Sequence, residues 1–144
     1  MLRHALRAAL CGLALVALPG LAAERYPSEQ GTVLVREIAS GLEHPWALAF
    51  LPDGQHLLVS ERPGRLRRVS LDGQISEPIT GVPDVFAQGQ GGLLDVRLSP
   101  DFENDRLVYL SYAEQGRDGL AGTAVGRGRL DAQGRRLEQF EVIF

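Results

Sequence analysis

The sequence has a single cysteine and no lysine. The cysteine, Cys11, lies in an apolar segment near the N-terminus, so the remainder of the chain cannot form an internal disulfide. All 15 basic residues are arginines, which excludes Schiff-base catalysis and lysine-based phosphate clamps within this chain. Aromatic residues make up only 6% of the sequence. A core built from this chain therefore depends mainly on aliphatic side chains.

Neither sign of charge dominates the sequence. The formal net charge is −3 at pH 7, and loss of Arg3 and Arg7 with an N-terminal leader would bring it to −5. Nucleic-acid recognition relies on a basic face, so we expect no nucleic-acid partner. The pairs Arg67-Arg68 and Arg135-Arg136 are interpreted as solvated strand or hairpin residues.

The first 23 residues are typical of an export signal. Basic side chains precede an almost wholly apolar run at residues 8–18, and residues 20–23 supply small side chains for cleavage. The apolar run is shorter than the ~20 residues that a membrane-spanning helix needs. We therefore expect a signal peptide at residues 1–23, a mature chain from residue 24, and a periplasmic or secreted protein without a stable membrane anchor.

The mature chain repeats one pattern of short strands and turns. Residues 47–53 and 94–100 align as strands that each run into a Pro-Asp turn. The later strands of the two repeats are predicted at residues 56–60, 65–69 and 75–80 and at residues 106–112, 123–130 and 137–144. An exposed loop is predicted at residues 113–122. Alternating apolar and polar residues, with no helical stripe after the leader, indicate an all-β chain.

Four strands per repeat are typical of a β-propeller blade. Periods of ~40–50 residues point to such arrays, and closed propellers have ~4–8 blades. Residues 24–144 are therefore expected to form the first two four-stranded blades of a larger ring, a fragment that is the N-terminal part of a longer protein. The apolar run Val142-Ile143-Phe144 looks like the middle of a strand. The alternative is a small complete β-sandwich.

Two segments resemble a known family. GQGGLLDVRLSPDF (residues 89–102) and HPWALAFLPDGQHLLVSERPGRLRRV (residues 44–69) are similar to the pyrroloquinoline quinone (PQQ)-dependent soluble aldose sugar dehydrogenases of the glucose/sorbosone dehydrogenase family. The resemblance runs from Gly31 onward. It implies a six-bladed propeller, PQQ and calcium as cofactors, oxidation of an aldose at C1 to a lactone, and electron transfer to an artificial or respiratory acceptor.

The resemblance also implies what this chain does not supply. Relatives take the proton from the sugar with a histidine in a His-x-x-Gly-Arg-Leu-like segment that follows the position of Phe144. No catalytic residue is therefore assigned here, and the groups that grip PQQ and calcium are expected mainly in later blades. The chain alone is expected to be inactive.

The loops that precede the two inner strands are the candidate binding site, since such loops can line one mouth of a propeller channel. The residues are Glu43, His44, Pro45 and Trp46 in the first repeat, and Gln90, Gly91, Gly92 and Leu93 in the second. The amide of Gln90 suits sugar hydroxyls or quinone oxygens, and the glycines permit close backbone approach to a ligand. The resemblance places Gln90 where sugar and PQQ meet. The alternative is a flexible inter-blade loop.

Other polar residues are interpreted structurally. Trp46 is expected to pack between blades, and His44 to be a loop residue. Asp95 and Arg97 share a strand face and can pair, whereas Glu61-Arg62 can form a salt bridge or a turn contact. No metal ligand is assigned, because three residues of one predicted hairpin lack the spacing of an EF-hand loop: Asp101, Asn104 and Asp105.

Two other functions are compatible with the sequence. A non-redox propeller enzyme, such as a lactone hydrolase, would place acidic metal ligands around the channel. A propeller that binds a glycan or a protein would need no catalytic group. The preferred aldose, the natural electron acceptor and the oligomeric state have no signature in these residues.

Overall fold

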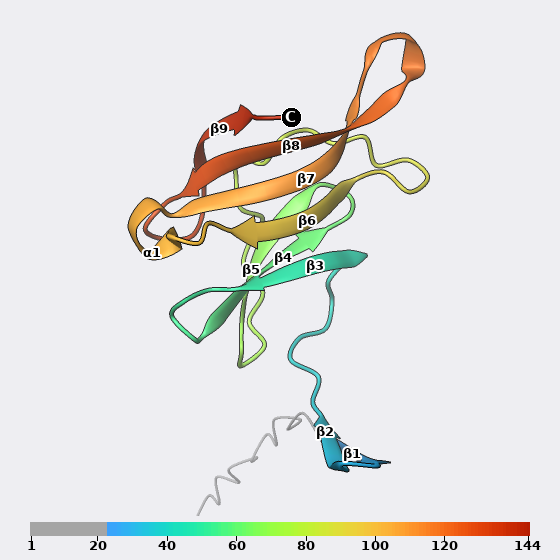
Figure 1. Ribbon diagram of the computed structural model, residues 1–144, viewed down its shortest axis with the longest axis vertical. Coiled ribbons are helices and arrows are strands. Elements are labelled where there is room, and N and C mark those ends of the chain that lie inside the picture. The colour runs from blue at the N-terminus through green and yellow to red at the C-terminus, as the bar shows by residue number, and fades with distance from the viewer. Residues whose placement is uncertain (1–22) are drawn as a thin grey trace, which may run out of the picture. The chain divides into compact units, whose positions relative to one another are not determined.

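The computed structural model describes residues 23–144 (Figure 1). The predicted signal peptide, apart from its last residue, lies outside this range. The described chain divides at residues 36 and 37 into two units. No helix among the described residues is long and apolar enough to span a membrane.

The first unit contains a β-hairpin that the sequence analysis did not predict. Strands β1 (Glu24–Ser28) and β2 (Gly31–Val35) pair in antiparallel register, and all their residues are exposed. The turn depends on Gly31, whose φ of 129° few other residues adopt. The Ser28 hydroxyl donates a hydrogen bond of 2.7 Å to the Gly31 carbonyl and so closes the turn.

The second unit, residues 37–144, contains two antiparallel sheets in which consecutive strands are neighbours (Figure 1). We call the first sheet blade 1 and the second blade 2. Blade 1 consists of β3 (Pro45–Phe50), β4 (His56–Glu61) and β5 (Arg65–Ser70). Blade 2 consists of β6 (Leu93–Leu98), β7 (Leu107–Gln115), β8 (Ala121–Leu130) and β9 (Leu137–Val142), with single helical turns α1 (Phe102–Asp105) and η1 (Arg117–Gly119). The predicted all-β class is confirmed.

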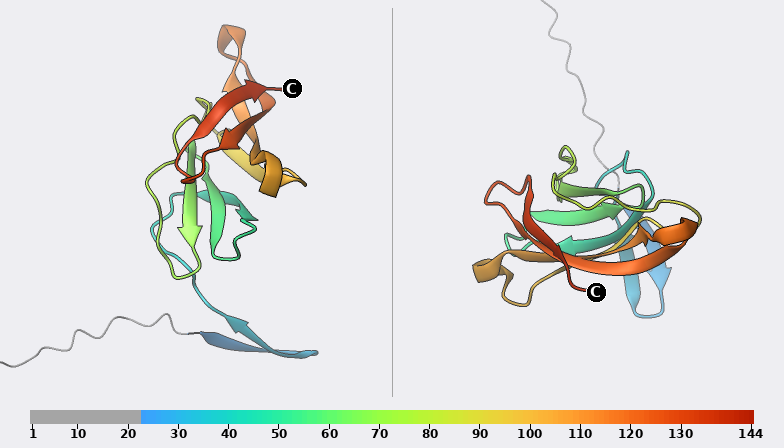
Figure 2. Two further views of the ribbon diagram at one scale, coloured as in Figure 1. Left: turned by 90° about the vertical axis from the view of Figure 1, so that its left-hand side faces the viewer. Right: turned by 90° about the horizontal axis from the view of Figure 1, so that it is seen from above.

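The main core lies between the two blades, which stack as two layers with β3 beside β6 (Figure 2). Leu58 and Leu66 of blade 1 meet Val96, Leu110 and Tyr112 of blade 2, and all five are at most 1% exposed. Burying one such aliphatic side chain stabilises the fold by about 1.5–3 kcal/mol. A smaller cluster on the opposite face of blade 1 contains Leu57, Val59 and Val69.

Matching hydrogen bonds confirm the internal repeat. The Ser60 hydroxyl accepts the Ala47 N–H at 3.1 Å, and the Ser111 hydroxyl accepts the Asp95 N–H at 3.0 Å. Both inner strands are irregular at this place. These bonds match Ala47 to Asp95, one residue later than the sequence alignment, and bring the two Pro-Asp turns into register.

The predicted fourth strand of blade 1 is wrong. Residues 75–80 contain only isolated bridges, at Ile75 and Thr80. The Ser76 hydroxyl accepts the Arg68 N–H. In a regular strand pair a backbone carbonyl would accept this N–H. Pro78 has no N–H to contribute to a ladder. Blade 1 therefore has three strands.

The loop predicted at residues 113–122 is also largely wrong. Strands β7 and β8 remain paired from Ala113 opposite Thr123 to Gln115 opposite Ala121, and only η1 closes the hairpin. Gly116, Gly119 and Gly122 suggested a loop, but an antiparallel ladder uses backbone groups and tolerates glycine near its end.

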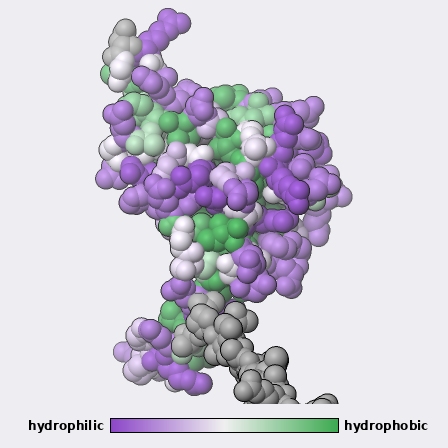
Figure 3. Space-filling model, turned by 180° about the vertical axis from the view of Figure 1, so that it is seen from behind, coloured by the Kyte–Doolittle hydropathy of each residue, from purple (hydrophilic) through white to green (hydrophobic). Residues whose placement is uncertain are grey.

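Some apolar side chains of the second unit remain exposed. Trp46, Leu48 and Phe50 alternate along β3 and are 49%, 51% and 66% exposed; we call them the β3 stripe. On the side seen in Figure 3, apolar surface forms separate patches among polar residues. Blade 1 thus covers β6, whereas neither sheet within residues 37–144 covers the side chains of the β3 stripe.

Candidate functional site

The loops before β3 and β6 converge on one open pocket of about 340 Å³. Both strands begin at the right-hand side of Figure 1. The pocket is lined by His44, Pro45, Trp46, Arg62, Gly89 and Gln90. The structure therefore brings together residues that the sequence analysis selected from two separate repeats. Glu43, Gly91, Gly92 and Leu93 were also selected, but they do not line this pocket.

Gln90 lies at the tip of a tight turn. The Gly91 N–H donates to the Gln88 carbonyl at 2.8 Å, and Gly89 adopts a φ of 56°. Gln90 is exposed at the pocket wall. Its amide can therefore both donate to and accept from a ligand without first breaking a packed contact.

Gly91 and Gly92 are required by packing within the protein. A Cβ added at Gly91 would lie 2.4 Å from the Phe86 carbonyl oxygen, and one at Gly92 would lie 2.2 Å from the Arg62 carbonyl oxygen. Gly92 also has a φ of 141°, which disfavours other residues. The close approach expected toward a ligand is thus made toward neighbouring backbone.

Arg62, the first residue after β4, contacts both loops. Its Nη1 donates to the Gly89 carbonyl at 2.6 Å and to the Gly91 carbonyl at 3.4 Å. Its backbone carbonyl accepts the Leu93 N–H at 2.9 Å, and its N–H donates to the His44 carbonyl at 3.0 Å. This role of Arg62 could not be predicted from the sequence, because an arginine before Pro-Gly does not identify partners so far along the chain.

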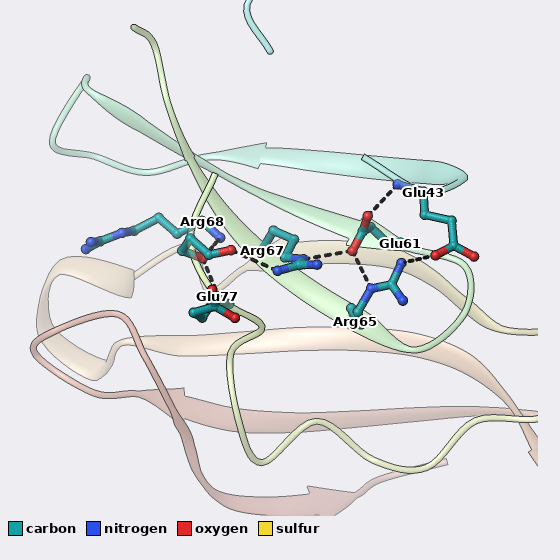
Figure 4. Close-up of polar contacts among 7 residues, drawn as sticks. Glu43, Glu61, Arg65, Arg67, Arg68 and Glu77 are labelled. Atoms are coloured by element: carbon teal, nitrogen blue, oxygen red, sulfur yellow. Dashed lines mark hydrogen bonds and ion pairs between the residues drawn. The ribbon is translucent and has the colours of Figure 1, made fainter. Parts of the chain in front are cut away.

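Glu61 is the buried centre of a cluster of charged side chains (Figure 4). Its side chain is 1% exposed and accepts hydrogen bonds from Arg65 Nε at 2.7 Å and Arg67 Nε at 2.8 Å. It also accepts the Glu43 backbone N–H. The salt bridge considered for the pair Glu61-Arg62 is therefore wrong in its partner: Glu61 pairs with Arg65 and Arg67 instead.

The surroundings of Glu61 keep it ionised. Burial by itself would raise the pKa of the carboxyl group, but hydrogen bonds from Arg65, Arg67 and the Glu43 amide outweigh burial and lower the pKa to about 2. Arg65 also pairs with Glu43 at 2.7 Å. The loop that precedes β3 is therefore attached to β4 by an ionised side chain.

The structure agrees with the prediction for His44 but not with that for Trp46. His44 is an exposed loop residue, as predicted, and holds a positive φ of 47°. Trp46 was expected to pack between blades, but it lies outside the core between the two sheets and is 49% exposed at the pocket. The indole is thus available as an apolar wall.

The remaining candidates have structural roles. Arg97 Nε lies 3.1 Å from Asp95 Oδ2, which confirms the expected pair. Asn104 donates to Asp101 at 2.6 Å, and Asp105 accepts the Leu107 N–H at 2.8 Å, so these residues shape the turn around α1. Among residues 23–144 no group of three or more His, Cys, Asp or Glu side chains could hold a metal ion.

A second pocket, of about 320 Å³, lies at the opposite ends of the strands between Arg68 and Arg106. Arg106 donates to the Leu130 and Asp131 carbonyls at 2.7 and 2.6 Å, and Arg68 donates to the Gln133 carbonyl at 3.0 Å. These arginines therefore connect backbone segments. The pocket at Gln90 is the better candidate for ligand binding, because an exposed amide and an indole both line it.

Comparison with known proteins gives consistent matches. The family profile described as Glucose / Sorbosone dehydrogenase matches residues 42–144. Aldose sugar dehydrogenase YliI of Escherichia coli (strain K12) is 51% identical over 113 residues, which cover 78% of this chain and 30% of that protein.

Solved structures match as well. The soluble aldose sugar dehydrogenase from Escherichia coli, in the apo form, matches with a TM-score of 0.70 and 53% identity, covering 72% of this chain and 30% of that chain. The PQQ-bound form of aldose sugar dehydrogenase from Streptomyces coelicolor matches with a TM-score of 0.62 and 28% identity, covering 88% of this chain and 35% of that chain. The chain thus spans about a third of the length of these relatives.

Proposed function

The chain belongs to the glucose/sorbosone dehydrogenase family, and we propose on this premise that the full-length protein oxidises aldose sugars at C1 to lactones with PQQ as its cofactor. The two blades would be the first of a closed, six-bladed ring. The names of the relatives support the reaction, and the PQQ-bound Streptomyces coelicolor enzyme supports the cofactor. The observation that carries the proposal is the convergence of two repeats on one pocket with Gln90 at its wall.

The residues at this pocket fit part of such a site. PQQ is a planar quinone, and when bound it supplies the acceptor for two electrons from the sugar. The exposed indole of Trp46 offers an apolar surface to a planar ring. Gln90 would bind and orient a sugar hydroxyl or a quinone oxygen through its amide. The groups that complete the cofactor site are proposed to come from later blades.

Calcium, export and the electron acceptor complete the proposal. We propose a calcium ion beside the cofactor, with none of the described residues as a ligand. Residues 1–23 would direct the protein to the periplasm or the medium and would then be removed. Electrons would pass to a respiratory or artificial acceptor, and the molecule oxidised would be a small sugar.

Reconstitution of the purified full-length apoprotein tests the function. PQQ and calcium are added, and reduction of an artificial dye is followed with a panel of aldoses. We expect sugar-dependent dye reduction only when PQQ is present, with the lactone as product. Gln90→Ala is expected to raise KM for the sugar, with Gln115→Ala, on the exposed β7 end, as a matched control.

Two further outcomes limit the proposal. Residues 24–144 alone are expected to be inactive under the same conditions. PQQ-independent hydrolysis of lactones by the full-length protein would favour the hydrolase alternative. Tight glycan binding without turnover would instead favour a binding propeller.

A further inference from the structure

We infer that Glu61 and Arg62 are positioning residues that together hold both loops of the pocket and so fix the placement of Gln90 relative to Trp46. The catalytic consequence of this inference rests on the proposed function. The structural consequence, an ordered pair of loops, can be measured without turnover. Neither residue is proposed to touch the sugar's reacting atoms.

Glu61 and Arg62 are neighbours in the chain but contact different loops. Glu61 is the last residue of β4, and Arg62 is the first residue of the turn that follows. Glu61 accepts the Glu43 N–H in the loop before β3. Arg62 donates to the Gly89 and Gly91 carbonyls in the loop before β6. One dipeptide therefore contacts both loops.

Arg62 contacts the residues on both sides of Gln90. Gly89 and Gly91 are the residues immediately before and after Gln90, and both carbonyls accept from the same Nη1 atom. Hydrogen bonds from a charged donor are stronger than neutral ones. Gly92 then packs against the Arg62 backbone so closely that a Cβ would not fit. The turn that carries Gln90 is thus fixed at three successive points.

The glutamate is held as firmly as the arginine. A buried carboxylate is costly unless its oxygens are paired, and here two guanidinium groups and one amide pair them. Arg67 is itself tied to the Ser76 carbonyl at 2.9 Å. The acceptor offered to the loop before β3 is therefore rigid, and so is the start of the strand that carries Trp46.

The matching position in blade 2 shows that the side-chain contacts of Arg62 are not needed to build a blade. The Arg62 N–H donates to the His44 carbonyl, and in blade 2 the Ala113 N–H donates to the Gly92 carbonyl in the same way. Alanine thus satisfies the backbone pattern at that place. The guanidinium of Arg62 adds only the contacts to the Gln90 turn.

Arg62→Ala and Arg62→Lys in the full-length protein test the inference. Misplacement of a binding group by about 1 Å can lower rates by about a hundredfold, so we expect Arg62→Ala to lower kcat/KM for the aldose about tenfold to a hundredfold. Most of that loss should come from KM, with Tm close to wild type. Arg62→Lys is expected to be intermediate, because one ammonium group can reach a single carbonyl. Arg135→Ala, at the opposite ends of the strands, is the control.

Amide hydrogen exchange gives a readout that does not need activity. Peptides covering residues 88–92 should exchange faster in Arg62→Ala than in wild type or Arg135→Ala. Wild-type exchange and wild-type kcat/KM in Arg62→Ala would overturn the inference. If Arg62→Ala does not fold, Arg62→Lys with wild-type kcat/KM and exchange would overturn it equally. If the wild-type protein shows no PQQ-dependent oxidation, the proposed function fails, while the exchange comparison still decides whether Arg62 holds the turn.

Discussion

Blade 1 and blade 2 carry different side chains at three matching positions on their second and third strands. Blade 1 places a charged cluster there, whereas blade 2 places an aromatic residue over two small ones. The positions are occupied by Glu61, Arg65 and Arg67 in blade 1 and by Tyr112, Ala124 and Gly126 in blade 2. The backbone pairing of the two sheets is the same at these positions, so the difference lies in the side chains.

The two blades carry different side chains at these positions because different parts of the chain pack on them. In blade 2 this face packs against blade 1, and Tyr112, 1% exposed, lies in the common core with its ring centroid 6.3 Å from that of Phe140. A Cβ at Gly126 would lie 2.4 Å from the Phe140 ring. The small residue is therefore required for the aromatic packing.

In blade 1 the same face is covered by the segment that leads into β3. Backbone N–H groups of such a segment need acceptors when they are partly buried, and the Glu61 carboxylate provides one to Glu43. A sheet that meets another sheet thus uses apolar side chains, and a sheet that meets a loop at the pocket uses an ionised one. The comparison separates packing that builds the fold from packing that shapes the site.

Removal of the Glu61 carboxylate should have the largest effect. Glu61→Ala leaves Arg65 and Arg67 close together without their anion, and breaking a buried pair destabilises by about 3–5 kcal/mol. The free energy of unfolding of the full-length protein, from denaturant titration, measures this. Glu43→Ala is the matched control: its carboxylate is 59% exposed, and loss of an exposed pair costs about 0–1 kcal/mol. Equal losses in the two variants would contradict a special role for the buried cluster.

Acid should weaken blade 1 through the same group. The pKa of Glu61 is about 2 in the folded protein, below its ordinary value of 4.5. The carboxylate therefore stabilises the fold fully above pH 4.5, and this contribution of about 3 kcal/mol is lost as the pH falls from 4.5 toward 2. Unfolding free energies measured across this range should show the slope in wild type and in Tyr112→Phe. A slope of wild-type size in Glu61→Gln would assign the acid sensitivity to other groups.

Sequence reasoning succeeded where local chemistry decides the structure. Pro-Asp turns and alternating apolar residues located the inner strands and the hairpins, and the order of the repeats identified the two loops that meet at the pocket. The prediction of a fourth strand in blade 1 was wrong because Ser76 and Pro78 interrupt the backbone hydrogen bonds of a strand pair. The apolar residues Ile75 and Ile79 nevertheless keep the spacing that suggested a strand. Alternation of apolar and polar residues indicates that every second side chain is buried, and an irregular segment can bury side chains in the same way.

The partners of Glu61 and Arg62 could not be read from the sequence. Arg62 bonds to carbonyls 27 and 29 residues away, and carbonyl acceptors occur at every residue, so residue types do not specify them. The role of Gly92 was misread for the same reason: the need for glycine was visible, but the group that approaches it was not. Such contacts follow from how the two blades stack.

Substitution in the β3 stripe should change the free energy of unfolding by a smaller amount, about 2 kcal/mol. Leu48 of β3 matches Val96 of β6, which is fully buried by blade 1. Val96→Ala should destabilise by about 2 kcal/mol through lost burial and a small cavity. If a further blade covers β3 in the proposed ring, Leu48→Ala should cost a similar amount in the full-length protein, although Leu48 is 51% exposed here. A change within about 0.5 kcal/mol, as at an ordinary surface site, would show that no blade packs on this face.

The two matching serines give the finest comparison between the blades. Among residues 23–144, the Ser111 hydroxyl bonds only to the Asp95 N–H. The buried Ser60 hydroxyl accepts the Ala47 N–H and also donates to the Leu94 carbonyl of blade 2 at 2.6 Å. Loss of one hydrogen bond costs about 0.5–1.5 kcal/mol, and buried groups left unpaired add to that. Ser60→Ala should therefore destabilise more than Ser111→Ala, by about 1 kcal/mol. Because the extra bond of Ser60 joins the two blades, equal losses would mean that this bond adds nothing to their stacking.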